Sequence, residues 1–570
     1  MDRFLLLAIN SKYIHSNLAV YCLKAATSYS EKVCIKECTI NNRIDDILKS
    51  VFEEKPDAIG ISCYIWNIDY VEQLLPELSK IMPEVPIWLG GPEVSYNAEY
   101  YVRKYKNVAC VMCGEGERIF RELMNCYVEG KLEKISEIPG ITCMKDGEVI
   151  VNEWPEPVNM DEVAMPYEVA GLEPKEYENR IIYYESSRGC PFSCSYCLSS
   201  VDKKLRFRSI DKVIKDIQFF LDNRTKLVKF VDRTFNCKKE HSRAIWKYIK
   251  DNDNGYTGFH FEIAADILDD EDIEILQGMR PGLIQLEIGV QSVNPDTLRA
   301  IHRNMNMDKL RNNIEGLRKK GNIHLHLDLI AGLPYEDMAS FRHSFDEIYG
   351  MVPHNLQLGF LKLLYGSLMR NEAEKYGIVC RDYAPYEVLY TDVLSYEEIL
   401  QLKKVENVVD MYYNSRMFVA GLRYLGYFYD SAFDMYMALG NFYDECYKDG
   451  SLPSRNDKYR ILYEFASESL NEGERIVLAD LLKYDMLLRD NAKSMPEFME
   501  ASSEFKERAR NYLPKGKLTK AEHIEIFNLD VTRFYETGEI NMMETPVHFD
   551  YLIRTSMDNN GSVRIMEETQ

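Results

Sequence analysis

The stretch Arg188-Gly189-Cys190-Pro191-Phe192-Ser193-Cys194-Ser195-Tyr196-Cys197 holds three cysteines in the spacing Cys-x3-Cys-x2-Cys. It comes soon after an apolar run, Ile181-Ile182-Tyr183-Tyr184, that is typical of a β-strand. Three thiolates on one tight loop can hold three irons of a cubane cluster. Redox clusters usually have four cysteine ligands, so a local set of three indicates an open fourth iron. The alternative is a zinc knuckle or buried structural cysteines, but zinc favours four ligands in paired spacings and no partner pair lies nearby.

The charge balance limits the class of partner. The chain has 570 residues, enough for about three to four domains. Its net charge of −22 argues against nucleic acid as the main partner, because phosphate binding needs clustered cations. One dense basic patch, Lys203–Arg208, is either a solvated face or a contact for a carboxylate or phosphate. We predict a small-molecule or peptide substrate.

Cysteine usage and hydropathy indicate the compartment. Fourteen cysteines in so long a chain are not a disulfide framework. The stretch Met1–Asn10 is too short and too mixed for a signal peptide, and no stretch reaches the length of a membrane span. Cys110 and Cys113 are spaced like metal ligands, but no second pair is near, so we expect both in the core. These features predict a protein of the reducing cytoplasm that does not associate with a membrane.

Residues 1–130 alternate short apolar runs with helical segments. This rhythm predicts βαβ units in a doubly wound parallel sheet, which binds ligands outside the carboxyl ends of its strands. The predicted strands are Phe4–Ile9, Val33–Thr39, Ala58–Cys63, Ile87–Gly90 and Ala109–Met112.

Small and polar residues stand at the ends of three of these strands. They are Ser62, the pair Gly90-Gly91, and Gly114-Glu115. A glycine pair lets a large flat ligand approach the backbone closely. The fingerprint of three spaced glycines after the first strand is absent, so a nicotinamide cofactor is not favoured.

Three further segments follow. Residues 131–180 predict a linker with a small hairpin around Lys145–Glu148. From 181 to 375 the βα alternation resumes, and 376–570 predicts a mainly helical accessory domain in which Ser395–Glu398 is a capping box. The predicted strands of the middle segment are Ile181–Tyr184, Leu227–Val231, Gly258–Ala264, Leu283–Val290, Ile323–Ile330 and Leu356–Leu361.

The cysteine loop, together with Gly289-Val290-Gln291-Ser292 and Gly332-Leu333-Pro334 after later strands, resembles the radical S-adenosylmethionine (SAM) enzymes. The resemblance implies a partial (β/α)6 barrel over 181–375. It also implies a 4Fe–4S cluster on Cys190, Cys194 and Cys197, with SAM on the open iron. The implied SAM contacts are Tyr196, Asp232, Glu262, Glu287, Gln291 and Arg303. Each acidic residue among them could instead form a structural ion pair, and Arg303 could instead lie on the surface.

The first 130 residues resemble the cobalamin-binding domain that precedes the barrel in many radical SAM enzymes. The resemblance implies that cobalamin contacts Ser62, Gly90, Gly91, Gly114 and Glu115. The chain has Lys12-Tyr13-Ile14-His15-Ser16-Asn17 where the methionine-synthase type has Asp-x-His-x-x-Gly, so a cobalt-binding histidine is not carried over. An empty, vestigial domain is the alternative.

The resemblance covers residues 1–375 well and the rest loosely, and 376–570 resembles the uncharacterised helical C-terminal domain of one branch of these proteins. The implied activity is reductive cleavage of SAM to a 5′-deoxyadenosyl radical, followed by methylation of an unactivated carbon, with a flavodoxin or ferredoxin as electron donor. Alternatives are a cyclase or rearrangement enzyme that uses cobalamin without methyl transfer, and a non-catalytic cobalamin or redox sensor. A methylthiolating tRNA enzyme is disfavoured, because three additional cluster cysteines before the barrel are expected there.

Overall fold

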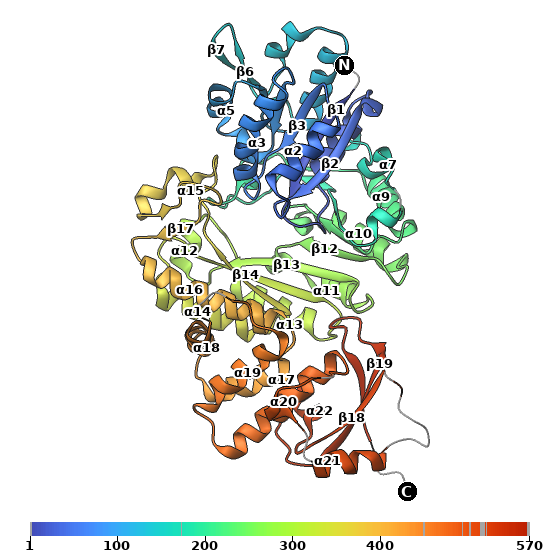
Figure 1. Cartoon of the computed structure of the whole chain (residues 1–570), viewed down its shortest axis with the longest axis vertical. Coiled ribbons are helices and arrows are strands. Elements are labelled where there is room, and N and C mark those ends of the chain that lie inside the picture. The colour runs from blue at the N-terminus through green and yellow to red at the C-terminus, as the bar shows by residue number, and fades with distance from the viewer. Residues whose placement is uncertain are drawn as a thin grey trace.

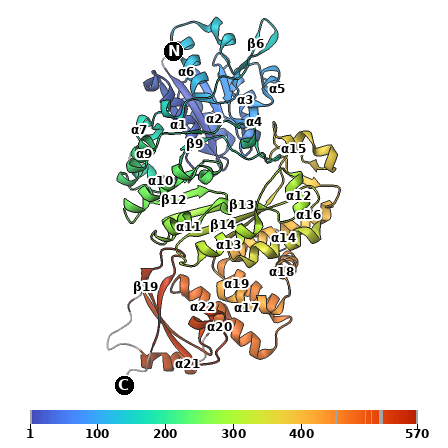
Figure 2. The same ribbon diagram turned by 180° about the vertical axis from the view of Figure 1, so that it is seen from behind.

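The computed structural model describes residues 3–172, 174–447, 451–492, 494–500, 503–512, 519 and 521–566. Three parts follow one another along the long axis in chain order: an N-terminal sheet, a central sheet and a C-terminal region (Figures 1 and 2). Within the described residues, no helix is both long and apolar enough to cross a membrane.

The N-terminal sheet has the strand order β2-β1-β3-β4-β5-β6-β7. Its first five strands are parallel and confirm the predicted βαβ rhythm. The hairpin predicted near 145–148 is β6–β7, and β6 pairs antiparallel with β5, so this segment extends the sheet. The strands are β1 (Phe4–Asn10), β2 (Val33–Thr39), β3 (Ala58–Ser62), β4 (Ile87–Gly90), β5 (Val108–Met112), β6 (Ile141–Lys145) and β7 (Glu148–Val151). The main helices are α1 (Leu18–Ala26), α2 (Ile44–Glu53), α3 (Ile68–Ile81), α5 (Ala98–Lys104) and α6 (Gly116–Val128).

The central sheet is parallel throughout, in the order β15-β14-β13-β12-β11-β8, as a partial (β/α)6 barrel requires. All six predicted strands are present. They are β8 (Ile181–Tyr184), β11 (Leu227–Phe230), β12 (Gly258–Glu262), β13 (Ile284–Gln291), β14 (His324–Ala331) and β15 (Asn355–Phe360). The helices between them are α9 (Ile210–Asp222), α10 (Lys239–Asp251), α11 (Asp270–Gln277), α12 (Pro295–Ala300), α13 (Met307–Arg318) and α14 (Met338–Gly350).

Both open edges of this sheet are covered by other parts of the chain. At β8, the loop after β1 forms a bridge in which Ile181 N donates to Ile14 O at 2.6 Å and Ser16 N donates to Ile181 O at 3.3 Å. At β15, the Asn414 amide pairs with the backbone of Leu356, at 2.9 Å to its N–H and 3.0 Å to its carbonyl. Unpaired edge groups would otherwise face solvent or another chain, so these contacts satisfy part of each edge strand.

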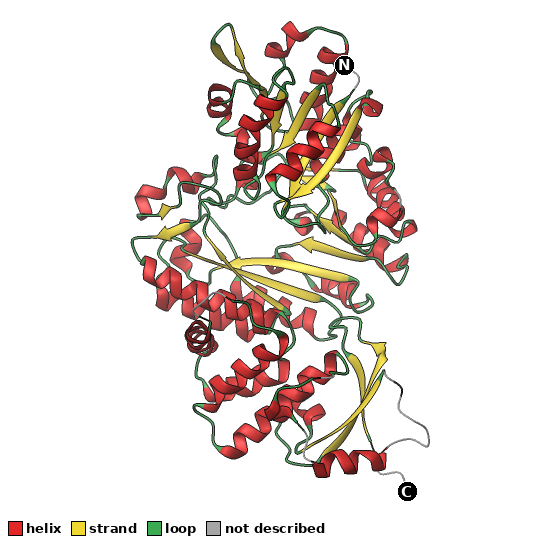
Figure 3. Cartoon of the chain, in the orientation of Figure 1, coloured by secondary structure: helices red, strands yellow, loops and turns green. Residues whose placement is uncertain are grey.

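The C-terminal region is mainly helical, as predicted, and begins with α16 (Tyr396–Val408), whose capping box forms between Ser395 and Glu398. It also contains an antiparallel sheet that the residue patterns did not predict (Figure 3). Its strands are β18 (Glu522–Phe527), β19 (Thr545–Arg554) and β20 (Gly561–Ile565). The other long helices are α18 (Ala432–Cys446), α19 (Arg455–Ser467) and α20 (Glu472–Arg489).

Candidate functional site

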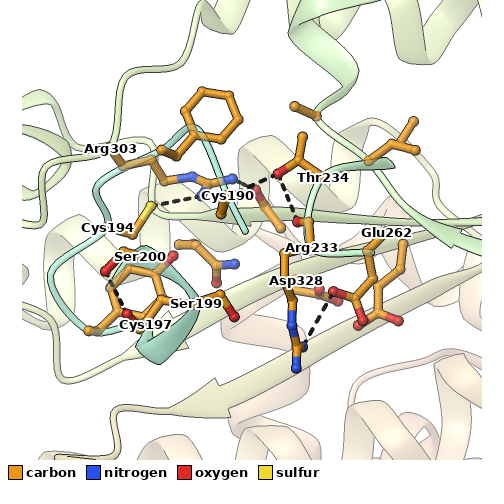
Figure 4. Close-up of a pocket in the computed structure, with 17 residues that line it drawn as sticks. Cys190, Cys194, Cys197, Ser199, Ser200, Arg233, Thr234, Glu262, Arg303 and Asp328 are labelled. Atoms are coloured by element: carbon orange, nitrogen blue, oxygen red, sulfur yellow. Dashed lines mark hydrogen bonds and ion pairs between the residues drawn. The ribbon is translucent and has the colours of Figure 1, made fainter. Parts of the chain in front are cut away.

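The three cysteines line one cavity of about 220 Å³ at the carboxyl ends of the central strands (Figure 4). They lie on a loop between β9 (Ser187–Arg188) and β10 (Arg206–Phe207), which pair antiparallel. Gly189 turns into this loop with φ of 88°, and a Cβ there would lie 2.7 Å from the Lys204 carbonyl oxygen. Only glycine fits such a turn without strain, so the motif's glycine sets the path of the loop.

In the described residues, no three His, Cys, Asp or Glu side chains converge as they would on one metal ion. A cubane cluster needs no such convergence, because each thiolate binds a different iron. Cys110 and Cys113 are buried in the N-terminal core, as predicted.

Strand ends supply the rest of the cavity. Besides the cysteines, the lining residues are Phe192, Tyr196, Ser199, Ser200, Arg233, Thr234, Glu262, Ile263, Ala264, Glu287, Gly289, Gln291, Arg303 and Asp328. Five of the six predicted SAM contacts are therefore brought together around the three cysteines. Asp328, on β14, was not among the predicted contacts, although it opens the element that ends in Gly332-Leu333-Pro334.

Arg303 is a cavity residue and not a surface one. Its Nη1 lies 3.5 Å from Cys194 Sγ, and its Nη2 donates to the carbonyl oxygen of Gly289. Gln291 stands beside it at a register shift in β13, with φ of 76°. Within the described residues, Arg303 Nε and Gln291 Oε1 are buried without a hydrogen-bond partner. Such orphan atoms call for a partner, which a bound cofactor can provide.

Asp232 does not line the cavity. It is buried behind the end of β8, where it accepts hydrogen bonds from Ser186 N at 2.9 Å and from the hydroxyls of Ser186 and Ser187, each at 2.6 Å. Burial raises the pKa of Asp232 to about 6, against the opposing effect of these bonds. In this structure its contacts hold the strand that leads into the cysteine loop.

The cavity carboxylates have divergent pKa values. Burial disfavours ionisation of Glu287, but His260 and Lys229 outweigh it and lower the pKa of Glu287 to about 2. Burial and the nearby charges of Glu287 and Glu262 raise the pKa of Asp328 to about 8. At neutral pH the cavity therefore contains an ionised Glu287 and a protonated Asp328, which can donate a hydrogen bond.

The candidate residues of the N-terminal sheet lie at or just after the carboxyl ends of three neighbouring strands, β3, β4 and β5. Ser62, the last residue of β3, pairs in register with Gly90, the last residue of β4. A Cβ on the adjacent Gly91 would lie 2.3 Å from the Cys63 carbonyl oxygen. Gly91 is thus needed for the turn itself. Gly114 lies beneath the Trp154 ring, where a Cβ would be 3.2 Å from the indole.

Glu115 faces the cysteine loop and joins a group that we call the Arg188 ion cluster: Glu115, Glu117, Glu185, Arg188 and Arg206. Arg188 Nε donates to Glu185 at 2.8 Å, and its Nη1 lies 3.2 Å from Glu117 and 3.5 Å from Glu115. Arg206 Nη2 lies 2.6 Å from Glu115. The Gly-Glu-Gly-Glu segment, residues 114–117, therefore anchors both ends of the cysteine loop.

His15 also bridges the two parts. Its Nδ1 lies 2.7 Å from the Tyr183 hydroxyl, on the first strand of the central sheet. Burial lowers the pKa of His15, so its ring is neutral at physiological pH. The neighbouring Asn17 caps α1 by accepting from Val20 N.

Comparison with known families agrees with this architecture. Residues 5–124 match the B12 binding domain, and residues 184–348 match the radical SAM superfamily. The chain is a radical SAM protein with a B12-binding domain. Residues 374–549 match a further family, described as a protein of unknown function (DUF4080). The resemblances drawn from the cysteine motif and the strand ends are confirmed.

Relatives of this radical SAM protein include methyltransferases. It is 27% identical over 51% of its length to the uncharacterized methyltransferase PH0819 of Pyrococcus horikoshii, of which the match covers 63%. It is 24% identical over 50% of its length to the cobalamin-dependent radical SAM methyltransferase TokK of Streptomyces tokunonensis, of which the match covers 44%. The chain thus spans less than two thirds of these curated relatives.

Solved structures share the fold. The radical SAM methyltransferase TsrM of Kitasatospora setae, with cobalamin and a [4Fe-4S] cluster bound, superposes with a TM-score of 0.54 at 18% identity over 68% of this chain and 76% of that one. The cobalamin-dependent SAM radical enzyme OxsB superposes with a TM-score of 0.51 at 16% identity, over 86% of this chain and 73% of that one.

Proposed function

We propose that this protein is a cobalamin-dependent radical SAM enzyme that methylates an unactivated carbon of a small-molecule or peptide substrate. The observation that carries the proposal is the set of three cysteines facing one polar cavity below a B12-binding domain. The methyltransferase relatives support the same reaction class. When bound, the 4Fe–4S cluster, SAM and cobalamin supply the radical and methyl-transfer chemistry, and the protein supplies binding and orientation.

We assign separate roles to the residues that line the cavity. Cys190, Cys194 and Cys197 hold the cluster, and Thr234 Oγ1, 3.6 Å from Cys190 Sγ, supports one ligand. Gln291 and Arg303 would offer polar groups to the carboxylate and hydroxyls of SAM, and the backbone at Tyr196 would contact its adenine. Ile263 and Ala264 contribute an apolar wall that limits access of water.

For cobalamin, we propose contacts at Ser62, Gly90 and Gly91, at the carboxyl ends of β3 and β4. We include Gly114 and Glu115 in the proposed site because they form the loop after β5. The Glu115 side chain pairs with Arg206, which holds this loop in place. His15 is held by Tyr183, which agrees with the absence of the cobalt-binding histidine motif.

We expect a small electron donor such as flavodoxin or ferredoxin, because reductive cleavage of SAM consumes an electron.

Every cysteine in the described part of the chain is free. Free thiols and an oxygen-sensitive cluster support a reducing, anaerobic cytoplasm as the working environment.

The function is tested with protein reconstituted anaerobically with iron, sulfide, cobalamin and SAM. Addition of a reductant is expected to produce 5′-deoxyadenosine, measured by mass spectrometry. With metabolites from a deletion strain as substrates, the product is expected to be heavier than its substrate by one methylene unit. A protein that binds the cofactors but never cleaves SAM would be a sensor and would overturn the proposal.

A second candidate is cyclisation or rearrangement without methyl transfer. It is favoured by the 21% identity, over 56% of this chain, to the anaerobic magnesium-protoporphyrin IX monomethyl ester cyclase of Rubrivivax gelatinosus. Formation of 5′-deoxyadenosine with a product that gains no methylene unit would favour this candidate.

Arg303→Ala is expected to weaken SAM binding by about tenfold or more, because a hydrogen bond to a charged group is worth roughly 1.5–3 kcal/mol. Cluster absorption is expected to persist, since no iron ligand changes. Calorimetric titration of SAM into reconstituted protein measures the difference. Arg299→Ala is the matched control, because Arg299 is exposed on the nearby α12 and pairs with Asp296. Equal SAM affinity in all three proteins would contradict the assignment of Arg303.

A further inference from the structure

The two sides of the cysteine loop, β9 and β10, form a narrow neck with little structure of its own. The two strands pair over two residues each and, among the described residues, join no other strand. A two-stranded ribbon is at best marginally stable in water. Backbone bonds beside it are those from Cys190 N to Asp202 O at 3.2 Å and from Arg208 N to Ser186 O at 2.8 Å. Closure of the neck therefore depends strongly on side chains that bridge its two sides.

Two arginines face each other across this neck. Arg188 and Arg206 are partners in the strand register, so their side chains leave the same face of the ribbon. Like charges directly opposite each other in a sheet are destabilising. The segment of the loop supplies one carboxylate to each arginine: Glu185 accepts from Arg188 Nε at 2.8 Å, and Asp202 pairs with Arg206. Each of these carboxylates balances one arginine, and neither spans the neck.

Glu115 spans the neck from the B12-binding domain. Its Oε1 lies 2.6 Å from Arg206 Nη2, and its Oε2 lies 3.5 Å from Arg188 Nη1. Among the described residues, it is the one carboxylate that forms ion pairs with both arginines. The side chains of Glu115, Arg188 and Arg206 are 22%, 14% and 16% exposed, so solvent screens these contacts only in part. One carboxylate thus holds the two sides of the cysteine loop together.

Glu115 also ties the loop after β5 to the neighbouring linker. Val158 N donates to Glu115 Oε2 at 2.7 Å, and Arg206 Nη1 donates to the Val158 carbonyl oxygen at 3.1 Å. Gly114, with φ of 94°, is covered by the ring of Trp154 from the same linker. The loop, the linker and β10 therefore form one closed set of contacts. A displacement of the loop would break this set and open the neck.

We propose that Glu115 and Arg206 are positioning residues that couple the two cofactor sites: cobalamin strengthens retention of the iron–sulfur cluster, and the cluster strengthens cobalamin binding. The inference rests on the proposed function, because it takes the loop after β5 as part of the cobalamin site. A ligand that holds this loop keeps Glu115 across the neck, and the closed neck holds Cys190, Cys194 and Cys197 together. The effect is reciprocal, because linkage requires each bound partner to change the affinity of the other by the same factor.

Arg206 is the residue that can report this coupling. It lies outside the residues that match the B12 binding domain, and it is not among the residues that line the cluster cavity. A substitution of Arg206 therefore removes no contact that we assign to either cofactor. Any change that it causes in the dependence of one site on the other passes through the neck.

The first test uses the wild-type chain alone. The dissociation constant of hydroxocobalamin is measured by anaerobic equilibrium dialysis, once with the apoprotein and once with the cluster-containing protein. Coupling between two sites typically amounts to about 5–150-fold, so the cluster is expected to tighten cobalamin binding by about fivefold or more. Loss of iron to EDTA, followed by cluster absorption, is expected to be slower with cobalamin present. Equal affinities in the two forms, or iron loss unaffected by cobalamin, would overturn the proposal.

The second test uses Arg206→Gln, which removes the charge that pairs with Glu115 but keeps a polar side chain at the neck. The ratio of the two cobalamin affinities is expected to fall to about one. Lys204→Gln is the matched control, because Lys204 lies on the same side of the neck and its side chain is 69% exposed. An unchanged ratio in Arg206→Gln, or an equal loss in Lys204→Gln, would contradict the assignment. If Arg206→Gln failed to fold, the wild-type comparison would still decide the proposal.

These outcomes separate the coupling from the proposed function. Equal cobalamin affinities in a protein that forms 5′-deoxyadenosine would leave the enzymatic function and remove the coupling. A large ratio in a protein that never forms 5′-deoxyadenosine would leave the coupling and remove the enzymatic function. Failure of cobalamin to bind to either form would overturn both.

Discussion

Replacement of Cys190, Cys194 and Cys197 by alanine is expected to abolish both iron–sulfur absorption and 5′-deoxyadenosine formation. The three thiols are the cysteines that line the cavity, and without them the cluster has no protein ligand. Absorption and electron paramagnetic resonance of the reconstituted protein measure the cluster, and mass spectrometry measures the nucleoside. Retention of either signal by the triple variant would contradict the assignment.

Cys237 provides a control for the assignment of SAM, and not a fourth cysteine, to the open iron. Its thiol lies close enough to Cys190 for their charges to interact, and burial together with that interaction raises the pKa of Cys237 to about 11. If SAM and not a fourth cysteine completes the cluster, Cys237→Ala retains both the cluster and SAM cleavage. Loss of iron and of cluster absorption in Cys237→Ala would show that Cys237 is a fourth ligand and would contradict the open iron.

Arg188→Leu is expected to destabilise the protein by about 3–5 kcal/mol, because removal of one partner from a buried ion network leaves unpaired charges. The side chains of Arg188 and Glu117 are only 14% and 8% exposed, so solvent does little to compensate. Urea unfolding of the apoprotein, followed by circular dichroism, measures the change in the transition that includes the N-terminal part. Arg118→Leu is the control, because Arg118 and Glu122 form a surface pair on the same helix as Glu117.

The same network predicts a dependence on pH. Burial would raise the pKa of Glu117, but the charge and hydrogen bonds of Arg188 outweigh it and lower that pKa below the ordinary 4.5. The unfolded state therefore binds more protons, so this stabilisation is complete above about pH 4.5 and is lost as pH falls through the folded-state value. The acid-induced loss of stability is expected to be shallower in Arg188→Leu. Identical acid profiles would show that Glu117 draws no stabilisation from Arg188.

Local residue patterns predicted the elements and most of the cavity. The alternation of apolar runs and helical segments located the parallel strands of both large sheets, because such runs form strands through burial on both faces. The carboxyl ends of parallel strands lie side by side, so polar residues in the carboxyl-terminal halves of β12 and β13 had to meet near the cysteine loop. This geometry is why Glu262, Glu287 and Gln291 could be assigned to the cavity from their positions along the chain.

Tertiary packing decides how particular polar side chains point. Asp232 follows β11 and Asp328 lies within β14, yet Asp232 turns back to Ser186 and Ser187 while Asp328 lines the cavity. The register shift after Gly289 places Gln291 beside Arg303. These orientations depend on neighbouring strands, which the spacing of residues along one segment does not encode.

The partners of distant segments were likewise outside the reach of local patterns. The Gly-Glu-Gly-Glu segment is typical of a ligand loop, but docking of the two parts places Glu115 and Glu117 against Arg188 and Arg206. The antiparallel sheet β18–β20 was missed because its strands are stabilised by one another and by the helices around them. Residue patterns along the chain therefore specify the parallel strands and the cysteine loop, and the resemblance that those segments carry implies the cofactors. The ion cluster and the covered edges arise from long-range packing, because each depends on contacts between segments far apart in the chain.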